Sequence, residues 1–175
     1  MKKAIILIAG LIMFLGACSA LRVNDPVAED IEQVKIYIEA IANNTNKYGL
    51  SIELMNALAA DIDADGRLLF VNNRDEADEV VRISILSYVL EPLTYDKNMN
   101  VEQYKLEVRV SVFLVDAKDN QEIWEDTQMS ALQIYRNDPD LAQGLAIENE
   151  MRQVAWEKLS RNIVRNIVKA QSQRD

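Results

Sequence analysis

The amino-acid sequence predicts an α+β fold, a two-layer sandwich in which two helices cover one face of a mixed sheet of four to five strands. Three observations lead to this class. Several segments alternate apolar and polar residues with the period of two that is typical of half-buried strands. Two other segments repeat apolar residues every three or four positions, as amphipathic helices do. Their order along the chain is β-α-β-β-β-β-α.

The first strand is expected over residues 31–41, where apolar residues such as Val34 and Ile36 alternate with polar ones. Residues 43–49 form a turn-rich loop. A helix is expected over residues 50–63, because apolar residues recur at every fourth position. The resulting apolar stripe consists of Leu50, Leu54, Leu58 and Ile62.

Asp65-Gly66 ends this helix, and a short apolar strand follows over residues 67–71. A strand-helix-strand unit of this kind favours a parallel strand pair. After a polar loop, residues 80–90 form the next strand. Its buried side is predicted to hold Val81, Ile83, Ile85 and Val89. Residues 92–100, which begin with a proline, are expected to form a turn.

The clearest strand covers residues 101–115, where apolar residues stand at the even positions from 104 to 114, so one face is buried and the other is wet. Residues 116–120 form a hairpin turn, and the returning strand covers residues 121–132. A long helix is expected over residues 141–170. Its apolar side consists of Ile147, Met151, Val154, Ala155, Leu159, Ile163 and Ile167. The strand order within the sheet stays open.

The first eighteen residues differ in composition from the rest of the chain. Two lysines precede an apolar run from Ala4 to Phe14, which is shorter than the roughly 20 residues that span a bilayer. The segment closes with Leu15-Gly16-Ala17-Cys18, which resembles the bacterial lipobox. This layout is that of a signal peptide. We expect residues 1–17 to be removed and Cys18 to be lipidated, in preference to a free thiol beside an ordinary cleavage site.

The lipid would attach the protein to a membrane without a spanning helix, because each buried methylene contributes about 0.8 kcal/mol. Residues 18–30 would form a polar tether, residues 31–170 a single α+β domain, and residues 171–175 a polar tail. In bacterial lipoproteins an aspartate after the cysteine favours the inner membrane. Ser19 stands there in this chain, which indicates the outer membrane and its periplasmic face.

The composition excludes most catalytic designs. The chain has no histidine and one cysteine, so histidine-dependent triads, histidine metal sites, a CxxC pair, a structural zinc site and an intrachain disulfide are excluded. We therefore expect a protein that is not an enzyme and holds no cofactor. The net charge is −9, and it becomes −11 without the signal peptide, which holds two lysines and no acids. This acidity argues against nucleic-acid binding.

Residues 61–66 begin like an EF-hand calcium loop, with Asp61, Asp63 and Asp65 at alternate positions and a glycine at the sixth. The twelfth position needs a glutamate, but it is Asn72, and a strand is expected where an EF-hand has its second helix. A solvated helix end is therefore the preferred interpretation, with calcium binding as a weak alternative.

Lys158, Arg161, Arg165 and Lys169 form a basic stripe on the last helix, opposite part of its apolar side. The stripe could contact the phosphate groups of a glycolipid. The preferred interpretation is an ordinary solvated face, whose cations also suit the C-terminal end of the helix dipole.

An ordered set of short motifs runs along the mature chain: the lipobox at Cys18, Asn43-Asn44-Thr45, Gly49-Leu50-Ser51-Ile52-Glu53, Glu76-Ala77-Asp78, the segment from Ser87 to Asp96, Tyr104-Lys105-Leu106, Val115-Asp116 and Glu122-Ile123-Trp124. By this set the chain resembles the LptE family of lipopolysaccharide-assembly lipoproteins over nearly the whole of its mature length, so residues 31–170 would form an LptE-like domain.

The resemblance implies a lipoprotein that plugs a large outer-membrane β-barrel translocon, an LptD-like partner, helps this barrel to fold and assists lipopolysaccharide delivery to the cell surface. Direct lipopolysaccharide contact stays open, because a charge of −11 opposes long-range attraction to an anionic glycolipid. Two alternatives also stay open: a periplasmic activator lipoprotein of a cell-wall synthase, and an auxiliary lipoprotein of a lipid transporter. The segment from Tyr88 to Asp96 and the long strand after it favour the first interpretation.

Overall fold

A computed structural model describes residues 33–173 of the 175-residue chain, so the predicted signal peptide, Cys18 and the tether lie outside the described residues. The elements are β1 (Val34–Ile38), β2 (Ala42–Asn43), α2 (Leu50–Asp65), β3 (Leu68–Phe70), the 3-10 turn η1 (Arg74–Glu76), β4 (Glu79–Tyr95), β5 (Val101–Asp116), β6 (Glu122–Arg136) and α3 (Leu141–Gln171). The predicted α+β class is confirmed.

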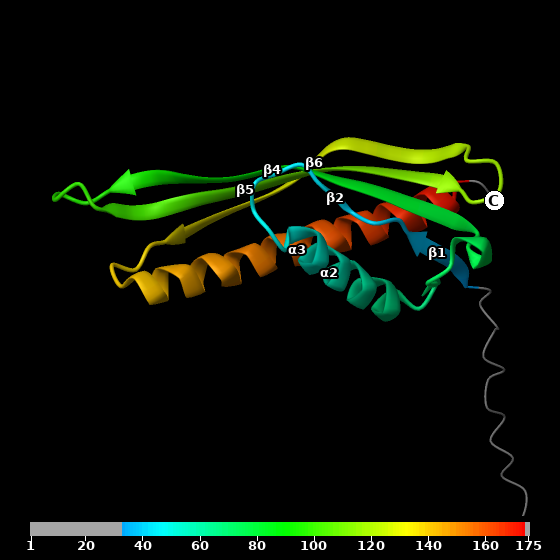
Figure 1. The fold of residues 1–175 in the computed structure, drawn as a ribbon, viewed down its shortest axis with the longest axis horizontal. Helices are drawn as coiled ribbons and strands as arrows, with labels where there is room; N and C mark the ends of the chain where they lie inside the picture. Colours follow the sequence, from blue (N-terminus) through cyan, green and yellow to red (C-terminus); the bar gives the residue numbers. More distant parts are fainter. Residues whose placement is uncertain (1–32, 174–175) are drawn as a thin grey trace, which may run out of the picture. The chain divides into compact units, whose positions relative to one another are not determined.

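The strands form one mixed sheet in the order β3-β1-β4-β5-β6, with the short β2 beside β4. β1 runs parallel to both β3 and β4, which confirms the parallel pair expected from the first strand-helix-strand unit. β4, β5 and β6 are antiparallel to one another. Both helices lie on the same face of this sheet (Figure 1).

The core lies between the sheet and the two helices. The four predicted stripe residues of α2 are buried, none of them more than 1 % exposed, and the apolar side chains at the even positions of β5 from Leu106 to Leu114 are fully buried. α3 adds Trp156, the largest fully buried side chain, together with Leu159, Ile163 and Ile167. The period-two pattern of the strands and the period-four pattern of α2 therefore identified the sheet face and the helix face that pack against each other.

Gly66 ends α2, as the sequence predicted, at a position with φ +74°. This is the left-handed region, where a side chain is strained and glycine is not. The helix includes Asp65 and so extends two residues beyond its expected end.

The predicted first strand is split into two. β1 ends at Ile38, which pairs with Val81 of β4, and β2 begins at Ala42, which pairs with Ser84. The chain thus uses four steps where β4 uses three, and the extra residue cannot be accommodated in a regular ladder. The period-two pattern continued through this irregularity and did not reveal it.

The second half of β4 differs from the prediction because it contains a β-bulge. The pairing of β4 with β5 shifts at Leu86, and this extra residue reverses the side chains that face the helices. Tyr88 and Leu90 therefore pack against the core. Val89, which was predicted to be buried there, alternates onto the opposite face and pairs with Glu107, so that prediction was wrong.

β4 also continues through Pro92 to Tyr95, where a turn was predicted. Proline has no N–H to donate, so a strand tolerates it at an edge. The second half of β4 is such an edge, because β1 and β2 pair only with residues between 79 and 85. The turn is confined to residues 96–100, and β6 likewise runs past its expected end to Arg136.

Within residues 33–173, no helix covers the second face of β4, β5 and β6 (Figure 1). This uncovered face carries two ion pairs, Lys105 with Glu91 at 2.8 Å and Arg109 with Glu107 at 2.7 Å. The predicted wet face of the long strand is thereby confirmed. Neither of the described helices combines the length and the apolar character that crossing a bilayer requires.

Two aliphatic residues of α2, one buried and one exposed, provide a test of this packing. Leu54 is fully buried, and Leu54→Ala should lower the free energy of unfolding by about 2–5 kcal/mol because it leaves a cavity under the sheet. Ile52 is 68 % exposed, and Ile52→Ala should change the stability by about 0.5 kcal/mol or less. Urea titrations measure both values, and equal losses would contradict the assignment of the buried face.

Candidate functional site

A row of hydrogen-bonding residues joins the two helices. α2 contributes residues at four-residue steps that face residues at the same spacing on α3. We call this set the helix seam: Glu53, Ala57 and Asp61 of α2, and Arg152, Trp156 and Ser160 of α3.

Glu53 is the central acceptor of the helix seam. Its carboxylate accepts two hydrogen bonds from the Arg152 guanidinium, at 2.8 and 3.1 Å, and a third from Trp156 Nε1 at 2.8 Å. Burial alone would raise the pKa of Glu53, but the hydrogen bonds from Arg152 and Trp156 outweigh it and hold the pKa below its ordinary value. Glu53 is therefore ionised at neutral pH.

A second carboxylate extends the cluster toward the sheet. Glu148 is only 8 % exposed, and its Oε1 accepts from Tyr88 Oη at 2.8 Å and from Lys47 Nζ at 2.7 Å. Burial raises the pKa of Glu148, but the bonds from Lys47 and Tyr88 again outweigh it and lower the pKa. Partial burial and the hydrogen bond to Glu148 raise the pKa of the Tyr88 hydroxyl.

Arg152 connects the two carboxylates. Its side chain is 9 % exposed, it binds Glu53, and its Nη1 lies 3.7 Å from Glu148 Oε1. That Nη1 atom is buried and makes no hydrogen bond within the described residues. The cluster thus holds two carboxylates, Arg152 and the Lys47 ammonium, so its formal charges balance.

Sequence reasoning missed this cluster, although the chain carries a signal for it. Glu148, Arg152, Trp156 and Ser160 follow one another at four-residue steps, and they form a row beside the apolar side of α3. A glutamate four residues before an arginine is an ordinary surface pair on a helix. Only the packing of α2 against this row shows that the pair is buried.

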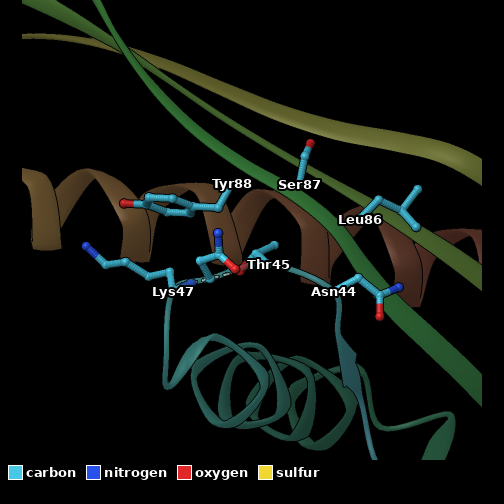
Figure 2. A pocket seen from close by; sticks show the side chains of 7 residues that line it. Asn44, Thr45, Lys47, Leu86, Ser87 and Tyr88 are labelled. Atoms are coloured by element: carbon cyan, nitrogen blue, oxygen red, sulfur yellow. Dashed lines mark hydrogen bonds between the residues drawn. The ribbon is translucent and has the colours of Figure 1, made fainter.

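A shallow pocket of about 460 Å³ lies next to the cluster (Figure 2). β2 pairs with β4 only as far as Ile85, and the loop then turns away, which leaves the bulge of β4 beside it. Asn43 shapes the loop, because its side chain accepts from Thr45 and donates to Lys47 O. The lining residues are Asn44, Thr45, Asn46, Lys47, Leu86, Ser87 and Tyr88.

The pocket offers hydrogen-bonding groups and one cation. Figure 2 shows Lys47 and Tyr88 extending in the same direction at one end of it, and the ammonium lies 5.3 Å from the centre of the ring. The lining holds amides, hydroxyls and an amine but no carboxylate or thiol. Such a surface can bind a polar group through hydrogen bonds.

The predicted basic stripe is exposed along its whole length, at Lys158, Arg161, Arg165 and Lys169. The last three of these line a groove of about 660 Å³ together with Arg67, which follows α2. We call this the basic groove. Its other lining residues are Asp61, Ala64, Asp65, Val164 and Val168.

The three aspartates of the calcium alternative do not form a loop. All three lie within α2; Asp61 accepts a hydrogen bond from Ser160, and Asp65 is paired with Arg67 at 2.7 Å. That pairing lowers the pKa of Asp65. Across residues 33–173, no three acidic, histidine or cysteine side chains gather as a metal site.

The comparison with protein families settles the relationship of the chain. The model of LptE, described as lipopolysaccharide-assembly, matches residues 34–170. The chain belongs to the LptE family. The matched range runs from the start of β1 to the last turn of α3 and includes both halves of the helix seam and the basic groove. No curated protein sequence matches the chain significantly.

Solved structures of low sequence identity share the LptE-like fold. An uncharacterised lipoprotein B from Nitrosomonas europaea has a TM-score of 0.58 at 20 % identity, over 80 % of this chain and 85 % of that one. The rare lipoprotein B from Shewanella oneidensis has a TM-score of 0.55 at 13 % identity, over 79 % and 97 %. A putative lipoprotein from Caulobacter crescentus gives 0.55 at 15 %, over 78 % and 93 %.

Arg152→Met should destabilise this LptE-family domain by about 3–5 kcal/mol, because it leaves Glu53 and Glu148 without their shared cation. The double variant Arg152→Met/Glu53→Gln should recover part of this loss. Arg82→Met is the matched control, since Arg82 forms a half-exposed pair with Glu39, which is worth about 1 kcal/mol or less. Chemical denaturation measures all three, and a loss for Arg152→Met no larger than that for Arg82→Met would contradict the role of the cluster.

The lowered pKa of Glu53 also predicts a dependence on pH. Its contribution to stability is present above the pKa of the unfolded chain, near 4.5, and is lost as the pH falls through the lower pKa of the folded state. Glu53→Gln should therefore show a smaller loss of stability on acidification below about pH 4.5 than the parent chain. Melting temperatures across the acidic range measure this, and parallel curves would refute it.

Proposed function

We propose that this LptE-family chain is an outer-membrane lipoprotein of the periplasmic face that plugs a β-barrel translocon, helps the barrel fold and assists lipopolysaccharide delivery. The observation that carries the proposal is the family match over residues 34–170, which includes nearly the entire described domain. The partner is an LptD-like barrel, and the protein acts on it by binding.

The uncovered face of the sheet supports a plug. A barrel lumen that contains water can accept a face whose charges are already paired, such as Lys105 with Glu91, without desolvating an isolated charge. The same face carries Leu132 and Ile134, which are 42 % and 52 % exposed on the edge strand β6. A mixture of paired charges and a few exposed apolar side chains is typical of protein interfaces.

A role without catalysis agrees with the chemistry of the described residues. The carboxylates of the cluster are ionised and hydrogen-bonded to cations, which stabilises the packing of α2, α3 and β4. Their lowered pKa values remove them from the range in which a carboxyl group donates or accepts protons near neutral pH. We therefore assign the cluster to structure and the surface to binding.

The proposed membrane anchor is a lipid on Cys18, which lies outside the described residues. The lipobox layout and the short apolar run before it support acylation of this cysteine, and Ser19 supports sorting to the outer membrane. The two alternative functions, activation of a cell-wall synthase and assistance to a lipid transporter, use the same kind of anchor, so the partner decides between them.

Purification of the tagged lipoprotein in mild detergent tests the partner. A large β-barrel should copurify with it, and recovery of a cell-wall synthase or a lipid transporter in place of the barrel would overturn the proposal. Leu132→Asp/Ile134→Asp should reduce barrel recovery about tenfold if the uncovered face meets the barrel. The control is Leu141→Asp/Leu145→Asp, which changes two exposed leucines on α3 and should leave recovery unchanged.

Cys18→Ala separates the anchor from the partner in the same experiment. This variant should lose acyl labelling and membrane fractionation. Acyl labelling that persists in Cys18→Ala would contradict the assignment of the anchor, whatever protein copurifies.

A further inference from the structure

The basic groove lies at the end of the domain where the chain enters from the predicted tether. Gln33 Nε2 donates to Gly66 O at 2.8 Å, and Val34 N donates to Arg67 O at 3.0 Å. The first described residues are therefore bonded to the segment that contributes Arg67 to the groove. Figure 1 shows β1 (blue) and the C-terminal end of α3 (red) at this same end of the sheet.

Some cations of the groove are paired with acidic side chains and others are not. Arg67 is paired with Asp65, and Arg161 lies 3.5 Å from Glu157. Within residues 33–173, Arg165 and Lys169 lie in no ion pair, and both are exposed. Among the described residues the groove therefore presents two cations without an ion-pair partner, and the Asp61 carboxylate, which also lines it, accepts a hydrogen bond from Ser160.

The walls of the groove hold these cations in a fixed arrangement. Arg161, Arg165 and Lys169 stand four residues apart on α3, so their side chains leave the helix on one face. Val164 and Val168, which line the groove between them, are only 5 % and 8 % exposed and are packed in the core. The spacing of the cations is thus set by a rigid helix rather than by a loop.

We infer that the basic groove docks on the anionic phospholipid headgroups of the membrane that carries the lipid anchor. The inference rests on the proposed acylation of Cys18. Gln33 stands fifteen positions after Cys18, and at about 3.3–3.6 Å per residue this stretch reaches at most roughly 54 Å. This tether keeps the groove close to the headgroups, and cations held near an anionic membrane surface are attracted to it.

Charge complementarity favours this occupant. Without the signal peptide the chain carries a net charge of −11, but screening limits the reach of exposed charges to about 8 Å at physiological ionic strength. The cations of the groove therefore act locally, and an anionic headgroup layer offers them many phosphates at one surface. The phosphate groups can reach Arg165 and Lys169 from outside because both side chains are exposed.

Acylated full-length protein in vesicles tests the inference. Acylation blocks the sulfur of Cys18, so Gln173→Cys, four residues after Lys169, provides a single thiol for a fluorophore. Vesicles of phosphatidylcholine with about 30 % phosphatidylglycerol and a headgroup spin label should quench this fluorophore about fivefold more than vesicles without the anionic lipid. Salt at roughly 0.5 M should remove the difference by screening. The same label at Asn98→Cys, in the turn between β4 and β5, should show no such difference.

Arg165→Glu/Lys169→Glu should abolish the additional quenching at Gln173→Cys. The matched control is Lys97→Glu/Arg136→Glu, which reverses two exposed cations outside the groove and should leave the quenching unchanged. Equal quenching on neutral and anionic vesicles, or no effect of the groove variant, would overturn the inference. Quenching that requires lipopolysaccharide in the vesicle would also overturn it, because the occupant would then be the glycolipid. The absence of quenching on every kind of vesicle would overturn the inference as well, because it would indicate that acidic residues of the tether fill the groove.

Flotation of each variant with both kinds of vesicle checks the anchor independently. The vesicles contain no barrel, so a negative quenching result leaves the proposed translocon partner untouched, and failure of the copurification leaves the quenching result untouched.

Discussion

The burial of Trp156 determines how the two helices sit on the sheet. Its indole is fully buried, and a buried N–H without an acceptor would cost free energy that Glu53 recovers by accepting its hydrogen bond. Glu53 is itself partly buried and requires the Arg152 guanidinium to remain ionised. A shift of α2 along α3 by one residue would separate these three groups, so the helix seam fixes the register of the helices as well as their contact.

The bulge at Leu86 connects this helix layer to the sheet. Without the extra residue, Tyr88 would lie on the uncovered face of β4, and its hydroxyl could not reach Glu148 beneath the sheet. The same position ends the pairing of β2, so the pocket and the open edge of β4 both begin there. Pro92 then reduces the capacity of this edge to bind another strand, because it offers no N–H. One inserted residue thus positions the polar cluster, the pocket and the edge.

Periodicity predicted the parts of the fold in which every residue obeys one repeat. The apolar stripe of α2 and the even positions of β5 from Leu106 to Leu114 are such parts, and they are buried as expected. Val89 was misplaced because a bulge changes the phase of a strand without changing its apolar composition. The cluster around Arg152 was not predictable in the same way, since a glutamate and an arginine on a helix are ordinary surface residues until a second helix covers them. The basic stripe was visible, but the contribution of Arg67 to its groove depends on the contact between distant segments.

The net charge of the chain is a poor guide to the field at any one surface. Screening limits the reach of exposed charges to about 8 Å at physiological ionic strength, so Arg165 and Lys169 act locally within an acidic protein. A lipid tether alone would leave the domain free to rotate about its anchor, whereas a second contact at the same end restricts that rotation. β4 contains 17 residues, which at about 3.3 Å each span roughly 55 Å. Docking of the basic groove at one end of this sheet would therefore restrict the orientations in which the uncovered face can meet a barrel in the same membrane.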